Sequence, residues 1–118
     1  MPTNEVYKEA AYIPLTVGAS VPARQPVIVG KIPGVTLTAT GASGTQVATV
    51  ATEGVFKLSV VANDGGASTI AVGDILYWSG TNASPTVNKN AANTRFGYAM
   101  DANSGSGTTT TIKVLIGY

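Results

Sequence analysis

Six carboxylate side chains are the most obvious groups in this sequence for acid–base or hydrolytic chemistry. They are Glu5, Glu9, Glu53, Asp64, Asp74 and Asp101. The chain has no histidine and no cysteine, which excludes the usual neutral-pH general base, a thiolate nucleophile and Cys-ligated zinc. Apart from Glu5 and Glu9, each carboxylate stands alone in or beside a predicted turn, where Asp commonly hydrogen-bonds its own backbone. Turn formation and surface charge are therefore the predicted roles, and an enzyme built on carboxylates alone is the alternative.

Two kinds of loop resemble ligand sites but lack the context that such sites need. Residues 41–44 and 104–107 are rich in glycine, yet neither is followed by Lys-Ser/Thr or by a predicted helix that would hold a phosphate. A calcium site at residues 63–64 or 101–103 lacks the dense run of oxygen ligands that hard cations require. We expect hairpin loops at these positions and neither a metal nor a cofactor.

Four aromatic residues lie close together in two predicted strands: Tyr77, Trp78, Phe96 and Tyr98. Aromatic rings on a surface form a platform on which bases or sugars stack. In small domains the same residue types more often fill the core, here beside Leu76 and Met100. Core packing is the prediction, and a stacking platform is the alternative.

Composition and charge limit the kinds of partner that this chain is expected to bind. The 118 residues fit one domain, and 44% of them are hydrophobic with a mean hydropathy of +0.22, which argues against disorder. Charged residues are 11% of the chain and the net charge is +1, far too little basic density for an electrostatic nucleic-acid binder. No run approaches 18 apolar residues. We therefore expect neither a nucleic-acid nor a membrane partner.

Fourteen glycines, six prolines and many Thr and Val residues favour short strands joined by tight turns. No window shows an apolar stripe at helical spacing. Seven or eight short strands predict an all-β fold, a small antiparallel β-barrel or sandwich. The expected strands are residues 12–17, 26–30, 34–40, 45–51, 55–60, 75–78, 95–100 and 110–116.

Alternation of apolar and polar residues predicts which side chains face the core. In residues 34–40, Val35, Leu37 and Ala39 are expected inward and the threonines outward. In residues 45–51, the inward residues are Val47 and one of Ala48 or Val50. The clearest alternation places these residues on inner faces: Phe56, Leu58, Val60, Ile112, Val114 and Ile116. The polar segment 79–93 offers only Val87 as an obvious inward residue.

The N-terminal region differs from the rest. Its tyrosines and charges, Tyr7-Lys8-Glu9 and Tyr12, precede several prolines, and no turn folds them back as a hairpin. We divide the chain into an extended arm, residues 1–20, and one β domain, residues 21–118. Residues 12–17, interrupted by Pro14, should lie at a sheet edge or as an arm. The arm is either a first strand with a frayed tip or a segment that docks on a neighbour by β-addition. The polar start has no signal-like hydrophobic core, so the Asn82-Ala83-Ser84 glycosylation sequon is expected to be idle.

Several short motifs occur in an order that is more specific than any of them alone. They are Ala51-Thr-Glu-Gly-Val-Phe56, Val72-Gly-Asp-Ile-Leu-Tyr-Trp78, Gly97-Tyr-Ala99 and Ile112-Lys-Val-Leu-Ile116, preceded by Pro26-Val-Ile-Val-Gly-Lys31. Over roughly residues 20–118 the chain resembles the small capsid cement, or head decoration, proteins of tailed bacteriophages. The resemblance is to a structural family and implies no catalysis.

The resemblance implies a protein made in the host cytoplasm and placed on the exterior of the virion. There it would bind the expanded capsid and stabilise the lattice of the major capsid protein, commonly as a homotrimer at three-fold or quasi-three-fold positions. The candidate residues for the capsid or subunit interface are Val6, Tyr7, Lys8, Tyr12 and Arg24. A carbohydrate- or host-binding module that uses Tyr77, Trp78 and Tyr98 is the alternative.

Overall fold

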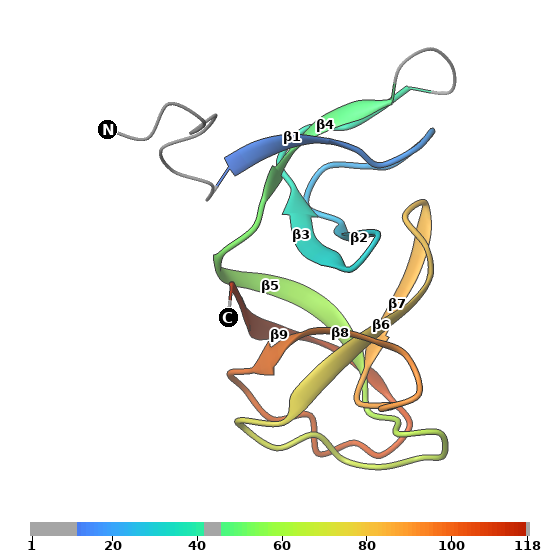
Figure 1. Cartoon of the computed structure of the whole chain (residues 1–118). Helices are drawn as coiled ribbons and strands as arrows, with labels where there is room; N and C mark the ends of the chain where they lie inside the picture. The colour runs from blue at the N-terminus through green and yellow to red at the C-terminus, as the bar shows by residue number, and fades with distance from the viewer. Residues whose placement is uncertain (1–11, 42–45, 118) are drawn as a thin grey trace.

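The structure is a computed structural model that describes residues 12–41 and 46–117 (Figure 1). These residues form nine antiparallel strands in two sheets and contain no helix, so the described chain offers no helix that could span a membrane. The four-stranded sheet has the order β1-β4-β3-β2, with β1 (Tyr12–Thr16), β2 (Pro26–Val29), β3 (Ile32–Thr36) and β4 (Val47–Ala51). The five-stranded sheet has the order β5-β9-β8-β6-β7, with β5 (Gly54–Val61), β6 (Ile75–Thr81), β7 (Ser84–Asn88), β8 (Thr94–Ala99) and β9 (Thr109–Ile116).

The two sheets lie one above the other in Figure 1, joined where β4 leads into β5. The edge strands β5 and β7 of the lower sheet contact each other, so this sheet curls back on itself as a half-barrel. Strands β2 and β3 contact β6, β7 and β8. The predicted all-β fold of small antiparallel sheets is confirmed, with one strand more than the upper expected number because residues 79–93 supply β7.

Most of the core lies inside the five-stranded sheet. Leu58, Val60, Ile112, Val114 and Ile116 are buried as the alternation predicts, while Phe56 is half-buried against them. The remaining buried residues of this cluster are Val35, Ala62, Ile70, Leu76, Trp78, Val87, Phe96 and Ala99. Close packing leaves no room at Gly97 of β8, where a Cβ would lie 2.5 Å from the carbonyl oxygen of Leu115. Strands β8 and β9 therefore approach more closely than any side chain larger than glycine allows.

A second, smaller core belongs to the four-stranded sheet. It consists of Val17, Val21, Val27, Ala48 and Val50, with Leu15 and Val29 partly buried against it. Residues 17–25, which connect β1 to β2, contribute to it and are fixed by Thr40: the Val21 N–H donates to Thr40 Oγ1 (3.0 Å), and that hydroxyl donates to the Gly18 carbonyl (2.8 Å). The connection thus covers one face of the sheet.

The face assignments for residues 34–40 and 45–51 were only partly right: Val35 is buried as predicted, but Leu37, Ala39 and Val47 are not. Strand β3 ends at Thr36, Leu37 and Ala39 are exposed, and Thr36 is fully buried. Burial of Thr36 is tolerated because its hydroxyl donates to the Pro22 carbonyl (2.7 Å) and accepts from the Gln25 N–H (2.9 Å).

Strand β4 differs from the expectation in the same way. Ala48 and Val50 are both buried, whereas Val47 is 44% exposed. Directly opposite residues of antiparallel strands share a face, and Val50 lies opposite Thr36 and Ile13. The pairing partners, which the sequence alone does not reveal, therefore fix the inward set.

Candidate functional site

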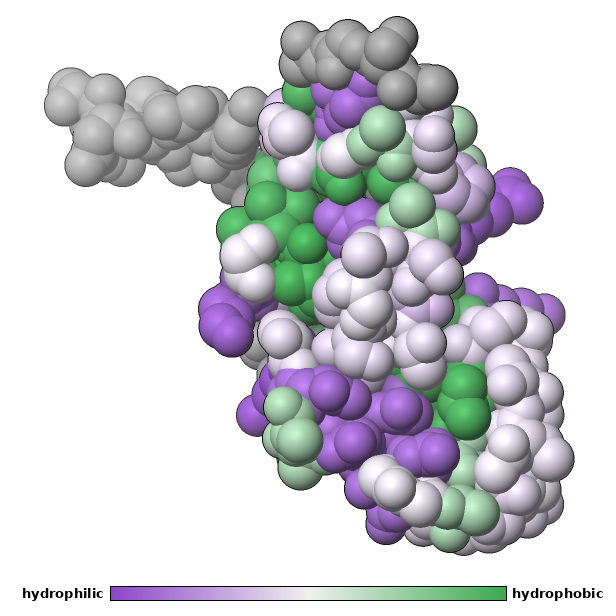
Figure 2. Space-filling view, turned by 90° about the vertical axis from the view of Figure 1, so that its right-hand side faces the viewer, coloured by the Kyte–Doolittle hydropathy of each residue, from purple (hydrophilic) through white to green (hydrophobic). Residues whose placement is uncertain are grey.

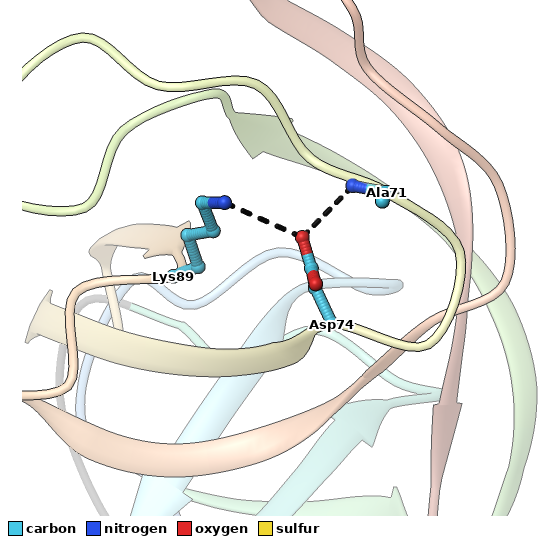
Figure 3. Close-up of polar contacts among 3 residues, drawn as sticks. All are labelled: Ala71, Asp74 and Lys89. Carbon is cyan, nitrogen blue, oxygen red and sulfur yellow. Dashed lines mark hydrogen bonds and ion pairs between the residues drawn. The ribbon is translucent and has the colours of Figure 1, made fainter.

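The isolated carboxylates serve turns and surface ion pairs, as predicted. Asp74 Oδ2 accepts from the Ala71 N–H (2.8 Å) and pairs with Lys89 Nζ (3.4 Å), which closes the turn before β6 (Figure 3). Asp64 Oδ1 accepts from the Gly66 N–H (3.4 Å) in the loop after β5. Both carboxylates therefore accept hydrogen bonds from backbone N–H groups of their own turns, and Asp74 also pairs with a lysine. These are structural roles.

The loop at residues 101–103, where the sequence argued against a calcium site, uses its polar groups internally. Asp101 Oδ2 accepts from the Lys113 N–H (3.0 Å), and Asp101 Oδ1 lies 3.6 Å from Lys113 Nζ. Asn103 is buried and donates from Nδ2 to the carbonyls of Thr108 (3.0 Å) and Val60 (3.3 Å). Within residues 12–41 and 46–117, no three acidic groups come together in a metal-binding cluster. The residues of this loop hold it against β5 and β9.

The aromatic group divides between the core and the surface. Phe96 is fully buried, and Trp78 is 9% exposed with its indole N–H donating to the Pro26 carbonyl (3.1 Å) across the two sheets. Tyr98 is half-buried on the outer face, where the Arg95 guanidinium lies 5.3 Å from its ring centroid and donates to its hydroxyl. Since Trp78 is part of the core, it is not available to a stacking platform. Leu76 is buried beside it as predicted, but the predicted core position of Met100 is wrong, because Met100 follows the end of β8 and is 41% exposed.

The first strand of the four-stranded sheet leaves one edge unpaired by other strands. Val17 N–H donates to the Gln46 carbonyl (2.9 Å), so by strand alternation residues 13 and 15 also direct their backbone groups to β4. Residues 12, 14 and 16 direct theirs to the open side. Pro14 lies on the open side, so its missing N–H removes no hydrogen bond between β1 and β4. It also prevents another strand from pairing continuously along this edge. The prediction that these residues lie at a sheet edge is confirmed.

The side chains on one face of this edge are uncharged and exposed. Tyr12 is 63% exposed, Val47 44% and Leu37 40%, and Pro14 and Thr49 lie beside them on the same face. Figure 2 shows hydrophobic residues gathered over the upper half of the molecule, where the four-stranded sheet lies. Contiguous apolar surface of this kind is typical of a protein-interaction site. We call these five residues the Tyr12 face.

Between the two sheets lies a groove whose centre carries two cations. Arg24 and Lys57 line both of its adjoining cavities, which measure about 410 and 320 Å³. The larger cavity is polar, with Gln25, Ser59 and Thr111 in its walls. The smaller one is mainly apolar and is lined by Arg24, Val35, Leu37, Phe56, Lys57 and Leu58. We call the two cavities together the Arg24–Lys57 groove.

Arg24 is held in this groove by a strained backbone. Its φ is 60°, a left-handed conformation that is uncommon for residues other than glycine. The Arg24 N–H donates to the Thr36 carbonyl (2.6 Å), and the Thr36 N–H donates to the carbonyl of Gln25 (3.0 Å). Buried Thr36 therefore fixes the turn that presents Arg24.

The two cations of the groove have no acidic partner among the residues that line its two cavities; Asp101 lines a third cavity with Lys57 and is paired with Lys113. No Asp or Glu lines either cavity, and among the described residues the ion pairs are Lys89–Asp74 and Lys113–Asp101. Lys57 lies directly opposite Lys113 in the β5–β9 pair, an arrangement that is destabilising for like charges. Asp101 compensates Lys113, which leaves the positive charge of Lys57 and Arg24 facing solvent.

Of the five candidate interface residues that the sequence predicted, two are among the residues that the structure describes. Tyr12 begins β1 and is exposed, and Arg24 lies in the groove. Tyr12 pairs with Ala51, which pairs with Val35 of the groove wall, so Tyr12 lies on the same side of the sheet as this wall and about 10 Å from it, and Leu37 belongs to both surfaces. Val6, Tyr7 and Lys8 lie outside the described residues. Lys57 was missed, because only the meeting of the two sheets brings it to Arg24.

Asn82 is a second residue whose role the sequence did not reveal. It lies between β6 and β7, and its side chain bonds the outer edge of β2: Oδ1 accepts from the Ile28 N–H (2.9 Å), while Nδ2 donates to the Ile28 (3.2 Å) and Val17 (2.9 Å) carbonyls. One amide thus joins the five-stranded sheet to both ends of the four-stranded one. Full use of this amide supports the expectation that the sequon is idle.

These features define a small all-β protein whose conspicuous surface consists of an uncharged sheet edge and a cationic groove. The sequence profile of the phage cement proteins matches residues 7–116, nearly the whole chain, and the chain therefore belongs to the phage cement protein family. The family is structural and associated with the phage capsid. No curated protein and no solved structure gives a significant match to the chain.

Proposed function

We propose that this protein binds the outside of the expanded phage capsid and stabilises the lattice of the major capsid protein, as a homotrimer at three-fold or quasi-three-fold positions. The observation that carries the proposal is the Tyr12 face, exposed and uncharged at the end of the chain's first strand. Apolar side chains without charges lose little on desolvation, so they suit a permanent protein contact.

Mass action explains how such a contact stabilises a shell. A protein that binds the assembled lattice and not the free subunit adds its binding free energy to the stability of the lattice. A trimer that spans neighbouring subunits gains avidity, because each contact after the first is intramolecular. Residues 1–12, with Val6, Tyr7, Lys8 and Tyr12, contribute to the interface in this proposal, together with Arg24.

The test is co-sedimentation of the purified protein with undecorated expanded capsids and, separately, with immature procapsids. We expect saturable binding to the expanded form and a higher temperature of capsid disruption when sites are filled. Deletion of residues 1–12 should abolish or greatly weaken binding while the β domain stays folded. Absence of wild-type binding to either particle would overturn the proposal.

A pair of matched surface variants locates the contact. Val47→Asp places a charge on the Tyr12 face, whereas Val72→Asp places one at the 65% exposed turn before β6. Because a buried unpaired carboxylate is costly, Val47→Asp should lower capsid affinity at least about tenfold. Val72→Asp should bind as the wild type does, and equal loss in both variants would mean that the Tyr12 face is not the contact.

A further inference from the structure

The Arg24–Lys57 groove has the chemistry of a site for an extended peptide that carries carboxylates around an apolar anchor. Its two cations lie where a polar and an apolar cavity adjoin, and acidic residues are missing from its described walls. The uncompensated Lys57 opposite Lys113 is unfavourable for the isolated chain. A local cost of this kind is expected where a surface is adapted to a partner.

The first eleven residues of the chain match this chemistry. They contain two of its six carboxylates, Glu5 and Glu9, with Tyr7 halfway between them. Side chains of an extended strand alternate, so Glu5, Tyr7 and Glu9 share one side at intervals of about 6.6 Å. Lys8, whose charge would be repelled by the groove, points to the opposite side.

We propose that residues 1–11 of a neighbouring copy occupy the Arg24–Lys57 groove. Tyr7 enters the apolar cavity beside Leu37 and Phe56, and Glu5 and Glu9 pair with Arg24 and Lys57. The inference deepens the proposed homotrimer and rests on it. It identifies the contact between one subunit and the next and assigns Arg24 and Lys57 to that contact.

The neighbouring copy, and not the same chain, is the source of the segment for two reasons. Residues 1–11 contain no glycine and no Asn-Gly or Asp-Gly pair, so they lack the signature of a tight two-residue hairpin turn. Fully extended, eleven residues span about 36 Å. That length exceeds the distance of about 10 Å from Tyr12 to the groove wall of its own sheet, so the segment is long enough to extend to a neighbouring subunit.

Charge reversal in the full-length protein tests the proposal without a capsid. Self-association is measured by sedimentation equilibrium over a series of protein concentrations at low salt. Arg24→Glu with Lys57→Glu should weaken association at least about tenfold, and Glu5→Lys with Glu9→Lys should do the same, because each puts like charges together. The variant with all four reversals should regain wild-type association. Lys31→Glu, an exposed cation between β2 and β3, is the matched control and should change nothing.

Three results would overturn the inference. In the first, the Arg24 and Lys57 reversals leave self-association unchanged. In the second, the variant with all four reversals associates no more strongly than either double variant. In the third, the wild-type protein stays monomeric at every concentration. The last result would assign the segment to its own subunit or to another partner. Capsid co-sedimentation is scored separately, so loss of this subunit contact and failure of the capsid-binding proposal are distinguishable.

Discussion

The two sheets of this protein are built from the same residue types but differ in how they obtain stability. The five-stranded sheet encloses thirteen buried residues, with Phe96 and Trp78 among them. The four-stranded sheet has a core of four valines and one alanine. Aromatic side chains bury roughly 150–250 Å² each, so the larger core carries most of the hydrophobic stabilisation.

The smaller sheet depends on the larger one at specific contacts. Val35 and Ile28 pack into the large core, the Trp78 indole bonds Pro26, and Asn82 bonds Ile28 and Val17. In return, the smaller sheet carries the Tyr12 face and half of the Arg24–Lys57 groove. The difference teaches that the proposed docking surface lies on the sheet with the smaller core, which the larger sheet supports.

Removal of the Trp78 ring should have the largest effect, because it damages the large core and a bond between the sheets together. We expect Trp78→Ala to lower the free energy of unfolding by about 3–5 kcal/mol. Trp78→Phe keeps most of the ring but not the indole N–H, and should cost less. Denaturant unfolding followed by far-UV circular dichroism measures both, and a near-neutral Trp78→Ala would remove Trp78 from the shared core.

Two glycine substitutions compare the rigidity of the sheets directly. In Gly97→Ala the new Cβ would meet the Leu115 carbonyl oxygen at 2.5 Å, so backbone must move, and we expect a loss of about 2–3 kcal/mol. In Gly34→Ala it would meet Val50 Cγ1 at 2.3 Å, a side chain in the smaller core, and we expect about 1–2 kcal/mol. Gly66→Ala meets nothing within 4 Å and is the control. A larger loss for Gly34→Ala than for Gly97→Ala would contradict the softer packing of the four-stranded sheet.

The same contrast explains what the sequence predicted and what it did not. Strands β5 and β9 alternate bulky apolar residues with polar ones, so their inner faces were predicted correctly. Strand β4 consists only of Val, Thr and Ala, and β3 ends in Val35-Thr36; these residue types are nearly equivalent on either face. There the inward set depends on pairing and on the bonds of Thr36 to residues 22–25, which are long-range features.

The sequence predicted parts of the Tyr12 face and of the groove only where an individual residue pointed to them. Pro14 marked the edge, and Tyr12 and Arg24 were candidates from their place near the N-terminus. The groove depends on Lys57, which is 33 residues from Arg24 in the sequence and reaches it because the sheets pack together. Strand β7 and the role of Asn82 were missed, because the polar composition of residues 79–93 indicates a loop.

Asn82→Ala should have the smallest effect on global stability but the most localised one. It removes three side-chain bonds to Ile28 and Val17, yet the edge is partly exposed and water replaces some of them. We expect a loss of about 1–2 kcal/mol. Amide hydrogen exchange should accelerate in β2, whereas the amides of β5 and β9 should keep their protection, because the larger sheet retains its own core.

Asn90→Ala is the matched control for this change, since the Asn90 side chain accepts from the Ala92 N–H within its own turn. It should leave the exchange of β2 unaltered. Uniform acceleration across both sheets in Asn82→Ala would mean that they unfold as one cooperative unit, and the distinction between a supporting and a supported sheet would then fail. Acceleration confined to β2 would instead show that a single amide from the larger sheet maintains the edge beside the proposed docking surface.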